Sequence, residues 1–188
     1  TDKANYNGAI AYVADLEGKI TKINLTDKET LYDKTTLFNA QSTSDNGRYI
    51  YTRPNITINN DNNLWLYFGT GNTQKLQEQS SNIQNSLYGI KDTNFPNFTS
   101  VSAGDVSRCK TAPNCPGPSD LGWYVNLQNA QKLTAETTID KNRVYFPIYE
   151  PTKSTNACNT GKAIFSGYDT KCGNSVLNVN MGTGVLSK

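Results

Sequence analysis

Short apolar stretches separated by turn residues about every ten positions run along most of this chain and predict β-strands. Residues 19–25 alternate apolar and polar side chains, which is typical of a strand with one exposed face. Residues 64–69, Leu-Trp-Leu-Tyr-Phe-Gly, are apolar on both faces and predict a buried strand. We expect further strands at residues 9–14, 48–52, 55–58, 122–127, 143–149, 162–168 and 175–180.

Three connecting segments carry their own signals. Asp15-Leu16-Glu17-Gly18 predicts a tight hairpin turn, because glycine supplies the positive φ that such a turn needs. Residues 73–84 predict a short surface helix, with an extended polar loop as the alternative, since few apolar positions anchor the segment. Residues 95–121 are rich in Pro, Gly and Ser and predict an irregular loop.

A weak internal repeat favours one all-β architecture. Residues 85–92 and 174–181 share the pattern Asn-Ser-apolar-x-x-apolar, and hairpins recurring at wide spacing are typical of β-propeller blades. A blade takes roughly 40 to 50 residues, so 188 residues would hold about four. We therefore predict β-propeller-like blades of short antiparallel strands, in an open or partial propeller of about four blades. Residues 1–188 would form a single partial domain, a fragment of a longer one.

Composition narrows the chemistry. Lys and Arg number 18 against 16 acidic residues, and because the signs are mixed along the chain we expect no nucleic-acid partner. The chain has no histidine, which excludes a Ser/His/Asp relay and any His-bearing zinc site. There is no run of some 18 apolar residues, so no transmembrane segment is predicted.

Individual side chains suggest no catalytic centre. Trp65 and Trp123 lie within apolar strands, where aromatic residues usually form core. Glu136, Asp140 and Glu150 are interpreted as solvated carboxylates rather than an acid/base pair. We predict no catalytic residue.

Four cysteines, Cys109, Cys115, Cys158 and Cys172, fall in two local pairs. Neither pair has the C-x-x-C spacing of a zinc or thioredoxin-like site. Three disulfide connectivities are open, and we favour the sequence-local pairs Cys109–Cys115 and Cys158–Cys172. The alternative is four free thiols in a cytosolic protein, but the polar surroundings favour an oxidising compartment.

Ordered motifs give the chain a family resemblance. Leu66-Tyr67-Phe68-Gly69-Thr70-Gly71 matches the apolar-Tyr-Phe-Gly-Thr-Gly segment of the C-terminal β-propeller domain of the PilC/PilY family, the tip adhesins and assembly factors of type IV pili. Residues 12–20, 85–92 and 122–127 resemble that family's Tyr-x-Gly-Asp-Leu-x-Gly-Asn hairpin, its Gln-Ser-Leu-Tyr-Gly-Ile-x-Asp box and its Gly-Trp-Tyr strand, and Val144-Tyr145-Phe146 and Cys172-Gly173 fall in register. The likeness spans almost the whole chain.

The resemblance also implies a calcium loop before the first hairpin. The matching positions here are Lys3, Asn5, Asn7, Gly8 and Ala11. Lys3 places a cation where the first carboxylate would stand and Ala11 supplies no oxygen, whereas calcium prefers six to eight oxygen ligands. We therefore expect a degenerate loop without metal, with bound calcium as the less favoured alternative, and no other cofactor.

By this resemblance the chain is expected to be a non-enzymatic type IV pilus biogenesis factor and tip adhesin. Its partners would be minor pilins or other pilus-tip components and a host or abiotic surface. It would lie at the pilus tip on the surface of a Gram-negative cell, at the outer membrane or in the periplasm. The alternatives are a quinone-dependent dehydrogenase of the quinoprotein propeller class and a periplasmic scaffold propeller.

Overall fold

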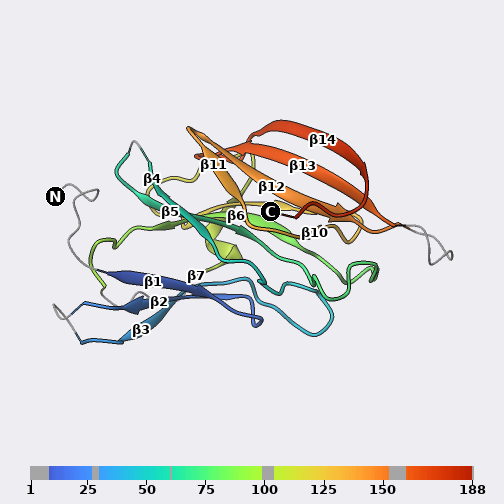
Figure 1. Cartoon of the computed structure of the whole chain (residues 1–188). Helices are drawn as coiled ribbons and strands as arrows, with labels where there is room; N and C mark the ends of the chain where they lie inside the picture. Colours follow the sequence, from blue (N-terminus) through green and yellow to red (C-terminus); the bar gives the residue numbers. More distant parts are fainter. Residues whose placement is uncertain (1–8, 27–29, 60, 99–103, 153–159, 188) are drawn as a thin grey trace.

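Three separate β-sheets, each largely antiparallel, make up the computed structural model, which describes residues 9–26, 30–59, 61–98, 104–152 and 160–187. Figure 1 shows the sheets one above another, and the sheet that contains residues 64–69 lies between the other two. No helix in this described part is long and apolar enough to cross a membrane.

Sheet A holds the first hairpin. Its strands, in spatial order, are β1 (Ile10–Ala14), β2 (Lys19–Asn24), β3 (Lys34–Asn39) and the short β7 (Gly104–Asp105), which runs parallel to β3. The predicted turn between β1 and β2 is confirmed, and Gly18 has a φ of 72°. Because β2 alternates buried and half-buried residues, only one of its faces belongs to the core.

Sheet B is the central layer. Its order is β4 (Asn55–Ile58), β5 (Leu64–Gly69), β6 (Ser86–Asp92), β9 (Gly122–Asn126) and β8 (Cys109–Thr111), with β8 parallel to β9. Every residue of β5 and β6 is buried, as the two-faced apolar pattern of β5 predicts. Both faces of this sheet therefore pack against a neighbouring sheet.

Sheet C contains the three longest strands among the described residues. Short strands β10 (Lys132–Leu133) and β11 (Thr138–Asp140) both pair with β12 (Arg143–Glu150), followed by β13 (Lys162–Asp169) and the edge strand β14 (Ser175–Thr183). Register shifts in the pairing of β14 with β13 lie near both ends of β14. Such bulges twist an edge strand and disfavour pairing with another chain.

Two apolar cores fill the seams between the sheets. Phe38, Phe68 and Tyr88 lie in the core between sheets A and B. Tyr67, Trp123 and Phe146 lie in the core between sheets B and C. Face-to-face packing of successive sheets in this way is typical of propeller blades, so the predicted all-β, blade-like fold is confirmed.

The number of blades and several elements differ from prediction. The described residues form three sheets rather than about four, because long connections such as 40–54 and 70–85 lie between the strands. Residues 48–52 form no strand, although Ile50 is buried and its amide donates to the Asp15 carbonyl. Strand β3 was not predicted, and the segment 95–121 contains β7, β8 and the 3₁₀ turn η2 (Val106–Arg108).

The helix predicted at residues 73–84 is also wrong. The segment is an extended loop with three short turns, which is the alternative that its few apolar anchors left open. Backbone carbonyls that a helix would pair internally are used elsewhere: those of Leu76 and Glu78 accept hydrogen bonds from the Lys132 ammonium group. This loop becomes one wall of the cleft described next.

Candidate binding cleft

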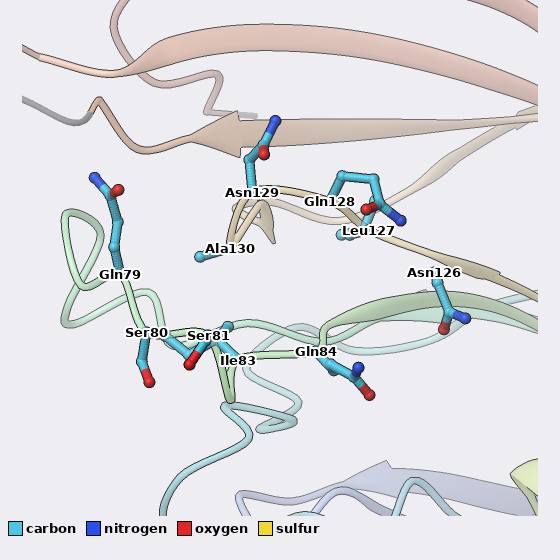
Figure 2. Close-up of a pocket in the computed structure, with 10 residues that line it drawn as sticks. All are labelled: Gln79, Ser80, Ser81, Ile83, Gln84, Asn126, Leu127, Gln128, Asn129 and Ala130. Atoms are coloured by element: carbon cyan, nitrogen blue, oxygen red, sulfur yellow. The ribbon is translucent and has the colours of Figure 1, made fainter.

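An open cleft of about 500 Å³ lies between the loop that connects β5 to β6 and the turn that connects β9 to β10. Figure 2 shows these two walls, residues 79–84 on one side and residues 126–130 on the other. The first wall belongs to sheet B, and the second runs from sheet B into sheet C. The cleft therefore lies at the seam between two blades, and such junctions between units are frequent places for ligand sites.

The turn at residues 126–130 is held in an unusual backbone conformation. Asn129 and Ala130 have φ angles of 53° and 54°, in the left-handed region that costs alanine about 1–2 kcal/mol. The Leu127 amide donates to the Asn85 carbonyl, and the Gln131 amide closes the turn on the Gln128 carbonyl. These bonds fix the turn against β6 and offset the local strain.

The opposite wall is tied down at its end. Ile83 is 8% exposed and its amide donates to the Ser80 carbonyl in a short turn. The next amide, that of Gln84, donates to the Asn46 carbonyl. The Gln84 carbonyl in turn accepts from the Arg48 guanidinium group, 2.9 Å away. Both walls are thus built by contacts to the body of sheet B and its loops.

One buried ammonium group joins the two walls. Lys132 is 1% exposed, and its Nζ donates to the carbonyls of Leu76 (3.0 Å), Glu78 (2.8 Å) and Ala130 (3.2 Å). Burial lowers the pKa of Lys132 to about 8, with the Glu78 carboxylate opposing the shift. Because two carbonyls come from the loop and the third from the turn, this side chain is a clamp across the seam.

The Gly-Thr-Gly segment makes room for this clamp. A Cβ on Gly71 would lie 2.6 Å from Cβ of Lys132, and one on Gly69 would lie 2.9 Å from a methyl group of Leu87. The Leu133 amide donates to the Thr70 carbonyl, which ties β10 to the end of β5. The segment is thus a strand exit packed against sheet C, and its glycines permit the close approach.

The predicted disulfide pairing is wrong. The structure joins Cys115 to Cys172, 57 residues apart in sequence, and leaves Cys109 as a buried free thiol. Sequence proximity failed because β8 runs into sheet B and buries Cys109 in the core, while the loop after β8 meets the turn after β13. Cys158 lies outside the described residues. The predicted Cys158–Cys172 pair is wrong because Cys172 is bonded to Cys115. Burial raises the pKa of the Cys109 thiol to about 12, so this thiol is unreactive.

The other candidates from the sequence do not form one centre. Of the calcium-like positions, Lys3, Asn5, Asn7 and Gly8 lie outside the described residues, and Ala11 pairs with Ile23 in sheet A. Within the described residues, no three His, Cys, Asp or Glu side chains are grouped as metal ligands.

The aromatic and acidic candidates have structural partners. Trp65 and Trp123 are buried in the core between sheets B and C. The Glu136 carboxylate pairs with the Arg53 guanidinium group at 2.8 Å. The Glu150 carboxylate accepts a hydrogen bond from the side-chain amide of Gln131. Asp140 lies at the end of β11, paired in register with Arg143. The cleft itself was not predicted from the sequence, since its amides stand in two segments about 45 residues apart.

Comparison with known proteins finds similarity in sequence to one protein and in fold to another. No protein-family model matches the chain. A "Type IV pilus biogenesis factor PilY1 homolog" of Xylella fastidiosa is 23% identical over 197 residues, which cover 89% of this chain and 13% of the relative. The crystal structure of the Pseudomonas aeruginosa PilY1 C-terminal domain matches with a TM-score of 0.65 and 14% identity, over 88% of this chain and 44% of that one.

The chain is similar to PilY1 proteins in sequence and in fold. The resemblance to the PilC/PilY family drawn from the sequence motifs is thereby confirmed, as is the propeller-like fold. The chain spans only 13% of the length of the curated relative and 44% of the crystallised chain. A europium-containing methanol dehydrogenase also matches, with a TM-score of 0.46 and 9% identity over 92% of this chain and 23% of that one, a likeness too weak to bear on function.

Proposed function

We propose that this chain is part of a non-enzymatic factor that promotes type IV pilus assembly and contacts an external surface. The observation that carries the proposal is the relation to PilY1, whose curated homologue is named a type IV pilus biogenesis factor. The full ordered set of motifs, from residues 12–20 to Cys172-Gly173, lies on the strands and turns that form the blades.

Chemistry supports a binding role. The chain has no histidine, and the polar side chains that line the cleft are amides and hydroxyls. Such groups form many neutral hydrogen bonds but are poor acids, bases and nucleophiles. A net charge of +2 on 188 residues provides little long-range steering, so we expect binding to depend only mildly on ionic strength.

Location and partners follow as part of the same proposal. The Cys115–Cys172 disulfide supports an oxidising compartment, as expected for a protein exported to the periplasm or cell surface. The partners are minor pilins or other pilus-tip components together with a host or abiotic surface. We place the protein at the pilus tip.

The test is a deletion in the bacterium that encodes the protein. Residues 9–187 would be removed from the full-length gene, and surface pili and adhesion would be scored against the wild type and a complemented strain. We expect fewer surface pili and weaker adhesion, with both restored by complementation. Wild-type levels of both, together with loss of a quinone- and calcium-dependent alcohol oxidation, would overturn the proposal and favour the dehydrogenase.

A further inference from the structure

The side chains of the cleft share one chemical character. Of the ten lining residues, five carry amides (Gln79, Gln84, Asn126, Gln128, Asn129), two carry hydroxyls (Ser80, Ser81) and three are apolar (Ile83, Leu127, Ala130). No lining side chain carries a charge, and none is aromatic. The cleft is therefore a neutral site with many hydrogen-bonding groups and a small apolar floor.

Much of this hydrogen-bonding capacity is unused. Within the described part of the chain, the side chains of Gln128 and Asn129 make no hydrogen bond. The Asn126 side-chain oxygen accepts from the Ser86 hydroxyl at 3.0 Å, which leaves its two N–H donors for another group. Each free amide offers a donor and an acceptor side by side. Two neighbouring hydroxyl groups on a sugar ring offer the matching acceptor and donor.

The backbone that carries these amides is held in place before any ligand arrives. The Lys132 clamp holds both walls through three carbonyls, and the left-handed residues Asn129 and Ala130 fix the turn. A site whose walls are already ordered loses less conformational entropy on binding. The three N–H donors of the ammonium group are occupied by these carbonyls and its side chain is buried, so it offers no free donor to a ligand.

From this geometry we propose that the cleft binds a neutral carbohydrate of one or two sugar rings. Its volume of about 500 Å³ lies in the range of small-molecule sites and admits a disaccharide. Amides would pair with ring hydroxyls, and Ile83, Leu127 and Ala130 would contact the C–H face of a sugar. Acidic sugars are disfavoured, because a carboxylate would lose water without meeting a cation.

This inference names a ligand class for the surface-binding part of the proposed function and rests on it. With no aromatic ring to stack on, a single cleft should bind weakly, with a dissociation constant on the order of 1 mM. Useful adhesion would then come from many copies that act together on a glycan-coated surface.

The experiment is a titration of the isotope-labelled protein followed by amide NMR shifts. The probes are maltose, lactose and cellobiose, each up to about 50 mM so that millimolar binding saturates. Glucuronic acid serves as the charged probe, and the neutral tripeptide acetyl-Ser-Gly-Asn-amide serves as the peptide probe. We expect at least one neutral disaccharide to give saturable shifts confined to residues 79–84 and 126–130.

Isosteric variants test the assignment to the cleft. Asn126→Asp and Gln128→Glu replace an amide by a carboxylate of the same shape, and each should weaken disaccharide binding roughly two- to tenfold, the effect of one lost hydrogen bond. Gln74→Glu makes the same chemical change on the exposed part of the β5–β6 loop outside the cleft and should leave binding unchanged. Unchanged spectra elsewhere show that each variant is folded.

Several results would overturn the inference. They are no saturable shift with any of the three disaccharides, shifts outside the two walls, equal binding of glucuronic acid, or stronger binding of the tripeptide. Counting surface pili on cells that carry Gln128→Glu separates the two proposals. If these cells have normal pili and the wild-type protein binds no saccharide, only the ligand class is refuted. If cells with the deletion described above have normal pili, the assembly function is refuted.

Discussion

The two seams between the sheets are stabilised by different means. The seam between sheets A and B contains a fully buried ion pair: Lys22 Nζ lies 2.6 Å from Asp92 Oδ2, and both side chains are 0% exposed. The Tyr12 hydroxyl donates to the same carboxylate, and the Lys22 ammonium donates to the Asn97 carbonyl. This seam therefore depends on two charges that are stable only together.

Besides the Lys132 clamp, the seam between sheets B and C depends on neutral and covalent links around one turn. The Tyr67 hydroxyl and the Trp123 indole both donate to the Thr170 carbonyl, at 2.9 and 3.0 Å. Two residues later, Cys172 forms the disulfide to Cys115. Asp169 organises the turn by accepting the amides of Lys171, Cys172 and Asn174.

The difference predicts distinct weaknesses. Loss of one charge should loosen the first seam, because the remaining buried charge has no counter-ion. Reduction should loosen the second seam, because its link is covalent. Each weakness can be tested without touching the other seam.

Removal of the charge on Asp92 should have the largest effect. Asp92→Ala leaves the Lys22 ammonium buried without its partner and also removes the acceptor for the amides of Asn94 and Phe95. We expect a loss of about 3–5 kcal/mol in the free energy of unfolding, measured by urea denaturation followed by tryptophan fluorescence.

A matched pair of variants separates charge from packing. Lys22→Met alone should destabilise because Asp92 is left unpaired, and the double variant Lys22→Met/Asp92→Asn should recover most of the loss, since no charge then remains buried. A double variant no more stable than either single one would show that shape rather than charge matching specifies this seam.

The sequence predicts the strands far better than the contacts between them. Periodicity locates β5 and β4 to the residue, because their apolar patterns are bounded by Asn and Gly turns. It misses β3, whose Thr-Thr-Leu-Phe run has no alternation that stands out from a loop. The family likeness likewise depends on local motifs, so it could be read from the chain directly.

Long-range geometry was not accessible in this way. The partner of Cys115 lies 57 residues away and depends on how sheets B and C stack. The Lys132 clamp joins residues more than 50 positions apart, and no local pattern marks that lysine as buried. The cleft follows from the same stacking, which is why no local pattern in the sequence indicated it.

The second prediction concerns the disulfide. A bridge that closes a loop of 57 residues is worth about 4 kcal/mol in the loop-entropy model. Cys115→Ser/Cys172→Ser should therefore lower the urea midpoint strongly. Peptide mapping without reduction tests the pairing. A Cys109–Cys115 peptide would contradict it, and equal stability of the double serine variant would show that the neutral links to Thr170 suffice.

The smallest effect concerns Lys132, a buried cation at the second seam. Its folded-state pKa of about 8 lies below the ordinary 10.5 because burial disfavours the ammonium form. The folded state therefore releases this proton first, so the contribution of Lys132 to stability is complete above 10.5 and is lost as the pH falls through 8. Between pH 7 and 9 the free energy of unfolding of the wild type should rise by about 1 kcal/mol relative to that of Lys132→Met. Above that window Cys109 and Tyr88, whose pKa values burial raises to about 12, act in the opposite direction. Urea midpoints at pH 7, 8 and 9 measure the difference, and parallel profiles for the two proteins would show that the clamp keeps its proton throughout.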